Sequence, residues 1–454
     1  MVPLGLGAQS PLGNLITGQS RTGLTVEGAG ARALGMGGAF IAVADDATAA
    51  TFNPAGLAQL LKPELSFVGQ GLDRRVSYEE FQTTTKGKQL GVSDSLLGHD
   101  HFDPLLLSAM VPLRLAGRNL AIQLSAQRAY TMGEGDSRHV VETPLSSGGK
   151  GANLDQSIQQ SGQVDLYSLS MAYECSQRIL LGLTFNQWRG RWDLDTVSQE
   201  TKAGVNSSLR FRQQNQLNGQ NFTLGLLWRW PAWSLGLVHS TAFQGSYSFQ
   251  TQINTTLPVP GSLASSSASV GLHWPESTGL GLAFRVSEKL LVTADIEHTA
   301  WSRARFVTSA PNLNGLNFFD LSQGSQGQDA TVLRLGMEKL WLSPNGLLIP
   351  FRLGASREPQ PVVDPVTGDQ RIMYGLSLGS GLKRGRYTWD LGYRYAWAKR
   401  QASQFLDLNQ VLAGTHTSSV GIERTTEQRL EMTFIMQFER ERVDRMLNYL
   451  FVGD

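Results

Sequence analysis

Apolar and polar residues alternate one by one along much of the chain. In 120–127 and 221–230, apolar residues occupy the even positions, and mostly small or polar residues occupy the odd ones. In 386–397, tyrosine, tryptophan and leucine alternate with arginine, threonine, aspartate and glycine. A period of two places successive side chains on opposite faces of a strand, so the pattern predicts β-strands with one apolar and one polar face. A soluble sandwich would alternate in the same way.

Strand length and buried charge separate the chain from a soluble sandwich. A tilted strand needs about ten residues to cross a bilayer, whereas strands of soluble proteins usually have about five or six. The segments that reach the longer length are 164–174, 219–230, 289–306, 385–400 and 416–438. Asp295, Glu338 and Asp390 share a face with small polar neighbours. Charges on an inner face would destabilise a sandwich core but are normal in a water-containing barrel lumen.

The same pattern gives a strand count. The predicted strands are 64–81, 104–115, 119–132, 161–174, 178–195, 206–230, 232–250, 276–286, 289–308, 329–341, 347–358, 370–383, 385–400 and 416–438. Their connections alternate between short and long, which is the pattern of outer-membrane barrels. The sequence therefore predicts an all-β fold, a 14-stranded antiparallel transmembrane β-barrel over residues 62–438. Both barrel ends are expected on the periplasmic side of a bacterial outer membrane.

The two ends of the chain do not follow the alternation. Residues 1–61 are rich in glycine and alanine, and their apolar side chains predict a small N-terminal hatch that plugs the barrel from inside. Residues 439–454 carry an amphipathic helical stripe of Val443, Met446, Leu447, Leu450 and Phe451. We expect this C-terminal extension to be periplasmic and to suit a periplasmic or outer-membrane protein partner.

Composition excludes several classes of protein. The 454 residues carry a net charge of +1, so nothing points to nucleic acid as a partner. Only 17% of the residues are charged, and we find no run of 18 apolar residues, which argues against a helical membrane protein. A single cysteine, Cys175, excludes a disulfide framework. His99, Asp100 and His101 have metal-like chemistry but lie in a polar loop without further ligands, so no metal, cofactor or catalytic site is predicted.

The tripeptide Asn53-Pro54-Ala55 has two interpretations. Pro54 lacks an N–H and biases Asn53 away from helical geometry, so the Asn53 side chain can cap a short helix that follows. In the first interpretation, the tripeptide is an ordinary start of a helix. In the second, it is an element that gates the hatch. Asp45 and Asp46 are interpreted as a turn and a cap.

Tryptophans and lumen arginines are further candidate site residues. Trp188, Trp192, Trp228, Trp230, Trp233, Trp301, Trp389 and Trp397 lie near predicted strand ends and are interpreted mostly as an interfacial girdle. Arg334 and Arg394 are candidate contacts for a carboxylate head group, because a guanidinium matches a carboxylate. Their alternative role is a cross-strand lattice of ion pairs that braces the wall.

Several stretches of the sequence together resemble one family. Gly30–Phe40 (GARALGMGGAF), Ala44–Thr48 (ADDAT) and Asn53–Leu57 (NPAGL) closely resemble the hatch of the FadL family. The segments 275–284, 294–302, 351–354, 374–379 and 390–393 are similar to its later strands. These proteins are outer-membrane transporters for long-chain fatty acids and other hydrophobic compounds.

The resemblance implies a 14-stranded barrel with a hatch, an external apolar groove and an internal ligand site. Phe40, Phe52, Asn53, Pro54 and Ala55 become candidate hatch residues for ligand contact and gating. Exit into the membrane would use a kink in the third strand. In this chain the third strand, 119–132, has no proline and no mid-strand glycine, so no kink is predicted.

The function predicted from the sequence is passive, hatch-gated diffusion of long-chain fatty acids or other hydrophobic small molecules through a monomeric barrel. No enzymatic activity or cofactor is predicted, and lipid or detergent is expected in the lumen. The alternative is a FadL-like structural or shuttle barrel in an outer-membrane secretion complex.

Overall fold

The fold was analysed in a computed structural model, which describes residues 28–79, 82–85, 88–97, 102–132, 134–144, 152–202, 205–256, 264–309, 314–315, 327–343, 347–364, 367–405 and 418–439. The predicted amphipathic C-terminal extension 439–454 lies outside these ranges apart from Glu439, and so do His99, Asp100 and His101. No helix in the described part is long and apolar enough to cross a membrane.

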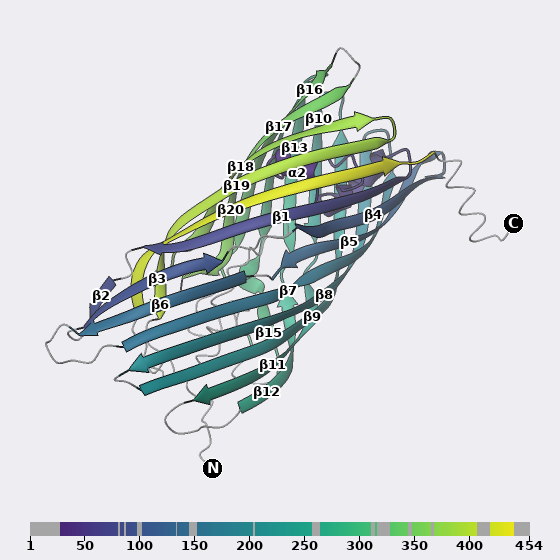
Figure 1. The fold of residues 1–454 in the computed structure, drawn as a ribbon. Coiled ribbons are helices and arrows are strands. Elements are labelled where there is room, and N and C mark those ends of the chain that lie inside the picture. The colour runs from purple at the N-terminus through teal and green to yellow at the C-terminus, as the bar shows by residue number, and fades with distance from the viewer. Residues whose placement is uncertain are drawn as a thin grey trace.

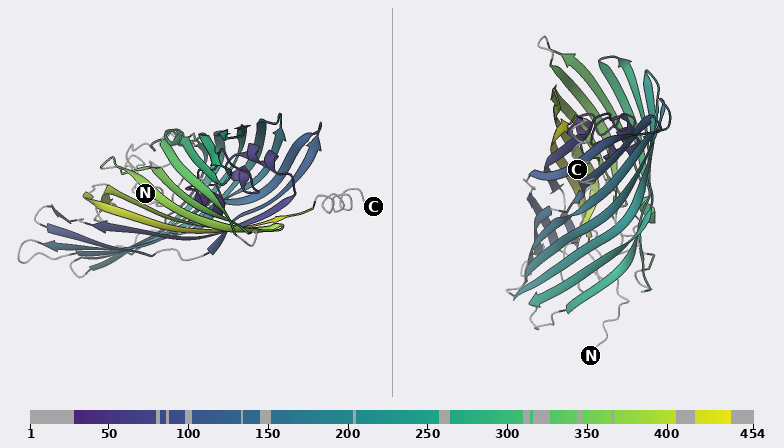
Figure 2. Two further views of the ribbon diagram at one scale, coloured as in Figure 1. Left: turned by 90° about the horizontal axis from the view of Figure 1, so that it is seen from above. Right: turned by 90° about the vertical axis from the view of Figure 1, so that its right-hand side faces the viewer.

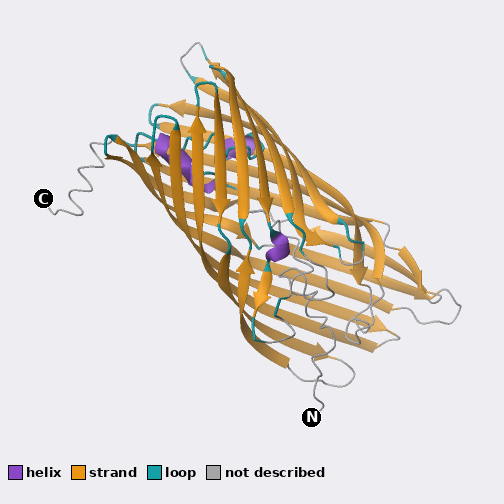
Figure 3. Cartoon of the chain, turned by 180° about the vertical axis from the view of Figure 1, so that it is seen from behind, coloured by secondary structure: helices purple, strands orange, loops and turns teal. Residues whose placement is uncertain are grey.

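The wall is a closed antiparallel barrel whose fourteen segments follow one another in chain order (Figures 1 and 3). The segments are β1 (Glu64–Glu79) with β2 (Gln82–Thr85), β3 (Lys88–Leu97) with β4 (Phe102–Leu115), β5 (Arg118–Thr131) with β6 (Glu134–Pro144), β7 (Ala152–Glu174), β8 (Ile179–Lys202), β9 (Val205–Arg229), β10 (Trp233–Ser240) with β11 (Phe243–Thr256), β12 (Ala264–Trp274) with β13 (Ser277–Ser287), β14 (Leu290–Thr299) with β15 (Arg305–Val307), β16 (Ala330–Leu342), β17 (Leu348–Val363), β18 (Gln370–Arg384), β19 (Tyr387–Phe405) and β20 (Ser418–Gln437). The barrel closes because β1 pairs with β20 along its whole length and with β4 on its other side. The predicted 14-stranded fold is confirmed.

Outward side chains are apolar and exposed, as a lipid-facing surface requires. Leu224, Leu335 and Leu391 are 49%, 60% and 48% exposed, whereas their neighbours on the inner face are polar, small or buried. Tight turns join the strands at one end, called here the short-turn end. The β4–β5 turn is an example, because Ala116 and Gly117 both have positive φ, 51° and 77°, as a two-residue hairpin turn demands.

Several predicted connections are in fact strands. The expected loops 82–103 and 133–160 contain β2, β3, β6 and the start of β7, and the loop 251–275 contains β12. Polar residues dominate β2, β6, the start of β7 and the first half of β12, so the apolar face that alternation detects is weak or missing there. Conversely, the predicted strand 232–250 is interrupted between β10 and β11.

The third wall segment is irregular, which the sequence did not predict. The register between β5 and β7 shifts between Arg128 and Tyr130, and β5 ends at Thr131 before β6 resumes at Glu134. On β7, Gly162 has a φ of 131°, and its carbonyl accepts a hydrogen bond from the Met132 N–H at 2.9 Å. The absence of proline and mid-strand glycine in 119–132 did not reveal this irregularity, because a bulge needs neither residue in the bulged strand.

Residues 28–60, called here the hatch segment, lie inside the barrel near the short-turn end (Figure 2). The segment contains helix α2 (Ala31–Gly35) and the short 3₁₀ helices η1 (Ala49–Thr51) and η2 (Pro54–Gln59). Its apolar side chains, including Phe40 and Leu57, pack with inward residues of the wall such as Met110, Leu180 and Leu227. The hatch segment and the wall therefore share one hydrophobic core.

The hatch backbone approaches the wall closely because glycines face it from many strands. We call these residues the glycine belt: Gly182, Gly225, Gly236, Gly281, Gly336, Gly354, Gly379 and Gly392. A Cβ atom on Gly182 would lie 2.2 Å from the Ala55 nitrogen, and one on Gly354 would lie 2.0 Å from the Gly37 nitrogen. A side chain at such distances would have to push the hatch backbone away from the wall, so the belt sets where the hatch segment sits.

Candidate functional site

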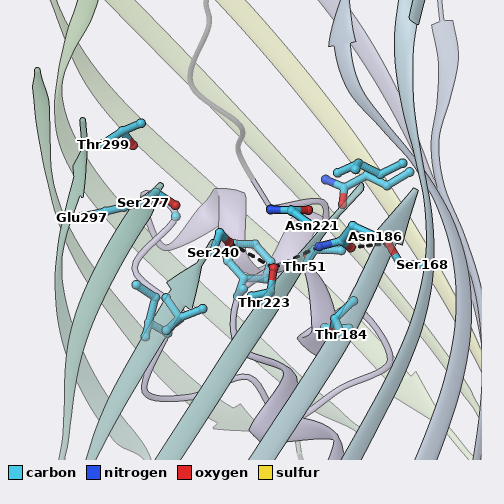
Figure 4. A pocket seen from close by; sticks show the side chains of 18 of the residues that line it. Thr51, Ser168, Thr184, Asn186, Asn221, Thr223, Ser240, Ser277, Glu297 and Thr299 are labelled. Carbon is cyan, nitrogen blue, oxygen red and sulfur yellow. Dashed lines mark hydrogen bonds between the residues drawn. The ribbon is translucent and has the colours of Figure 1, made fainter. Parts of the chain in front are cut away.

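A cavity of about 150 Å³ lies between the hatch segment and the wall (Figure 4). Ile41, Thr51 and Phe52 bound it on the hatch side. The wall contributes residues from β5, β7, β8, β9, β10, β13 and β14. We call this cavity the chamber.

Aromatic side chains form the apolar part of the chamber. Trp188 lies between Tyr130, Trp274 and Phe243, with ring centroids 6.3, 5.7 and 5.5 Å away. Trp301 meets Trp274 edge-on at 5.3 Å. These five rings are at most 6% exposed and belong to one buried cluster. The cluster provides a large, rigid apolar surface that faces the lumen.

Interruptions in the wall turn several of these rings inward. Ser240 at the end of β10 lines the chamber, and Phe243 at the start of β11 is buried in the aromatic cluster three residues later. On the neighbouring segments, the break between β12 and β13 follows Trp274, and η3 (Trp301–Arg303) separates β14 from β15. A strict alternation would place residues three apart on opposite faces, so each break resets which side chains face the lumen.

Polar side chains form a second row across successive strands (Figure 4). Ser168 donates to Asn186 at 2.6 Å, and Asn186 donates to Thr223 at 3.0 Å. Thr223 and Ser240 lie 3.0 Å apart at their hydroxyl oxygens. We call these four residues the polar arc. Asn221 accepts a hydrogen bond from the Trp188 indole at 2.9 Å, which ties the arc's strand to the aromatic cluster.

The two predicted head-group arginines are both in ion pairs. Arg334 lines the chamber and contacts Glu297 at 2.7 Å, and Arg394 contacts Glu358 at 2.6 Å. Both side chains are nearly buried, at 7% and 4% exposure. The geometry favours the lattice of ion pairs, while a role in head-group binding stays a prediction.

The predicted hatch residues come together at one level of the barrel. The rings of Phe40 and Phe52 pack edge-on at 5.2 Å, and Phe52 faces the chamber. Asn53 is fully buried and caps η2, since its Oδ1 accepts from the Ala55 N–H at 3.1 Å. Its amide also donates to the carbonyls of Ile41 at 3.0 Å and Leu226 at 3.1 Å. Asn53 thus joins two parts of the hatch segment to strand β9.

Carboxylates fix the rest of the hatch segment. Asp295 of β14 accepts from the N–H groups of Phe40 at 2.7 Å and Ile41 at 2.9 Å. Arg32 contacts Asp45 and, through two nitrogens, Glu338. Asp46 accepts from the Thr48 N–H at 2.8 Å, as the turn-and-cap interpretation expects, and burial raises its pKa above the usual value.

The interpretation of the tryptophans was partly wrong. Trp228, Trp389 and Trp397 are about 40% exposed on the outer face, but Trp188, Trp192 and Trp301 are buried inside the barrel. Residue type alone does not distinguish a girdle tryptophan from a lumen tryptophan. Trp188 and Trp192 do have the same parity along β8 as the inward Thr184 and Asn186, which was an available signal.

The fold is shared with several channels of known structure, although sequence identity is low. A FadL homologue from Pseudomonas aeruginosa matches with a TM-score of 0.66 and 15% identity, over 92% of this chain and all of that chain. The monoaromatic hydrocarbon channel CymD gives 0.59, with 15% identity over 91% of this chain and 99% of that one. The toluene transporter TodX of P. putida gives 0.55, with 15% identity over 91% and 100%. No model of a protein family matches the chain, and no curated protein matches it.

Proposed function

We propose that this barrel lets hydrophobic small molecules diffuse passively across an outer membrane. The observation that carries the proposal is the chamber, where buried aromatic rings line a cavity next to the hatch segment. Structures with the same fold are described as a monoaromatic hydrocarbon channel and a toluene transporter. An apolar ligand gains about 0.8 kcal/mol for each methylene group that leaves water, so aromatic walls favour such a route.

The size of the chamber bears on the ligand. An apolar cavity of about 150 Å³ accommodates a molecule such as benzene. The chamber of this chain has about the same volume, 150 Å³, and its aromatic side offers an apolar surface for one small ring while the polar arc lines the other side. A long acyl chain needs more space, so uptake of long-chain fatty acids would require the hatch segment to shift.

The irregular third wall segment supports a lateral exit. Tyr130, next to the register shift in β5, lines the chamber. The strand ends one residue later, at Thr131, so the chamber lies directly behind an interruption of the ladder. A ligand leaving here would enter the membrane without crossing the hatch segment.

Mass spectrometry of molecules extracted from the purified protein tests the ligand class. We expect apolar hydrocarbons or fatty acids bound in amounts close to one per barrel. The proposal also requires that cells expressing the protein take up a labelled monoaromatic hydrocarbon faster than cells without it. Equal uptake rates, with folded barrel verified at the surface, would refute transport.

Replacing Trp188 and Trp274 by alanine is expected to reduce hydrocarbon uptake at least tenfold. The two rings meet at 5.7 Å in the centre of the aromatic cluster, and the double variant removes its largest apolar surfaces. Trp389→Ala is the matched control, because Trp389 is 42% exposed on the outer face. Uptake per folded protein is the measurement, and an equal loss in the control variant would contradict a role of the chamber.

Asn53→Ala tests hatch gating. The substitution removes the donor that bonds to the carbonyls of Ile41 and Leu226. Each buried polar group left without a partner typically lowers the stability of the fold by about 1–3 kcal/mol. If hatch position controls passage, uptake of a long-chain fatty acid changes while uptake of toluene does not. Unchanged uptake of both, together with a lower melting temperature, would leave Asn53-Pro54-Ala55 with a structural role only.

A partner barrel in a secretion complex remains the alternative. That hypothesis depends on residues 439–454, which lie outside the described ranges except for Glu439. Co-purification of a stoichiometric protein partner would favour it.

A further inference from the structure

A second cavity, of about 260 Å³, lies on the other side of the hatch segment from the chamber. Arg32, Ala42 and Val43 line it, whereas Gly37, Gly38 and Ile41 line the chamber. The hatch backbone between residues 37 and 43 therefore separates the two spaces. The second cavity is bounded by the β9–β10 and β13–β14 turns at the short-turn end, and we call it the mouth cavity.

Three cations on neighbouring wall segments line the mouth cavity: Arg229, Arg285 and Lys289. Arg229 follows the buried, inward Leu227 at the end of β9, and Arg285 follows the inward Ala283 at the end of β13. Within the described ranges, no carboxylate lies at ion-pair distance from any of the three. Arg229 instead donates to the Gln59 side chain at 3.2 Å and to the Gln177 carbonyl at 3.3 Å.

This lack of partners contrasts with the arginines deeper in the lumen. Ion pairs with wall carboxylates are made by Arg74, Arg128, Arg334, Arg352, Arg371, Arg394, Arg400 and Arg429. Three carboxylates line the mouth cavity: Asp45 and Glu338 are paired with Arg32, whereas Glu288, exposed on the β13–β14 turn, makes no ion pair within the described ranges. Arg285 and Lys289 are exposed and likewise make no ion pair there, so the lining carries four cations against three carboxylates.

Apolar surface adjoins these charges. The rings of Trp230 and Trp233 stack at 3.6 Å with an angle of 15° between their planes, and both line the mouth cavity. Leu290, Leu291 and Leu340 complete the apolar part. A cavity that joins unpaired cations to stacked indoles matches a molecule with an anionic head and a hydrocarbon chain.

We propose that the mouth cavity binds the anionic head group of a single-chain amphiphile between Arg285 and Lys289, with its chain against Trp230 and Trp233. A guanidinium matches both carboxylate and phosphate oxygens, so the head group belongs to one of these two chemistries. A fatty acid would supply the first and a lysophospholipid the second. The inference is separate from the proposed transport, because it concerns equilibrium binding on the opposite side of the hatch segment.

Fluorescence quenching with the full-length protein in an uncharged detergent tests this site. The probes are decanoate, decyl phosphate and decanol, each brominated at the chain end, because bromine quenches nearby tryptophan. The quenching that disappears in Trp230→Phe/Trp233→Phe reports on the mouth cavity. We expect Arg285→Gln/Lys289→Gln to weaken this component at least tenfold for the anionic probes and less than twofold for decanol.

The matched control is Arg384→Gln/Arg386→Gln. It removes the same charge from an exposed turn at the same end of the barrel, away from the mouth cavity. This control should keep wild-type affinity for all three probes. A preference for decanoate identifies a fatty acid and a preference for decyl phosphate identifies a phospholipid-derived ligand. Equal losses in the two double variants, or no loss for the anionic probes, would overturn the proposal, whatever the outcome of the uptake experiments.

Discussion

Deletion of residues 1–60 is expected to leave a folded barrel that conducts ions continuously. The strand ladder closes through β1 and β20, which begin and end outside the deleted segment, so closure does not depend on the hatch segment. The deletion removes the hatch backbone that separates the chamber from the mouth cavity, so the two spaces join. Single-channel recording in planar bilayers measures the conductance, and the heat-dependent shift in gel mobility reports whether the barrel is folded.

The single substitution Gly182→Val is also expected to make the barrel conduct ions, but only intermittently. A Cβ on Gly182 would lie 2.2 Å from the Ala55 nitrogen, so Gly182→Val must displace η2 or strain the wall by about 1–3 kcal/mol. Gly71→Val is the control, because no atom lies within 4 Å of the corresponding position. Both variants should fold, but only Gly182→Val should show frequent channel opening. If the variant without residues 1–60 folds but shows no conductance, other parts of the chain close the lumen.

Leu224→Arg is expected to block assembly of the barrel. Leu224 is 49% exposed on the outer face of β9, where an arginine near the bilayer midplane costs about 2–4 kcal/mol. The adjacent Thr223 faces the chamber, so Thr223→Arg places the same charge in the lumen. Denaturant unfolding of barrels reconstituted into liposomes gives the stability difference between the two variants.

The choice of Thr223 follows from the glycine belt. An inward glycine such as Gly392 would be a poor control, because its Cβ would lie 2.4 Å from the Ala31 carbonyl oxygen. Equal destabilisation by Leu224→Arg and Thr223→Arg would contradict the assignment of the two faces.

The sequence predicted the lipid-crossing part of the wall well because lipid imposes an apolar face. Leu224 and Leu391 alternate with inward residues, and their strands begin and end within a few residues of the predicted positions. Alternation is lost in β6 (EGDSRHVVETP) and in the serine-rich first half of β12 (ASSSASVGLHW). In β12 the alternation is confined to the second half, where Val270, Leu272 and Trp274 face inward, and the serines before them hide the start of the strand.

The candidate site was predicted less completely, for a different physical reason. The pairing of Arg334 and Arg394 follows from charges that share one face, which can be read from parity along a strand. The aromatic cluster depends on the breaks after Ser240 and Trp274, which reset that parity. The mouth cavity depends on which carboxylates Arg32 engages, and such long-range pairing has no signature in a single sequence.

The position of the hatch segment also has a consequence for folding. The Gly30 N–H donates to Glu431 at 3.0 Å, and the Ala31 N–H donates to Thr433 at 2.8 Å, across 401 and 402 residues of chain. Helix α2 is therefore held by β20, the strand that also closes the barrel against β1. Contacts of such high sequence separation form late, because loop closure precedes them. Docking of the hatch segment and pairing of β1 with β20 thus belong to one late folding step. In a folding intermediate whose barrel is still open, the hatch segment is therefore not yet docked.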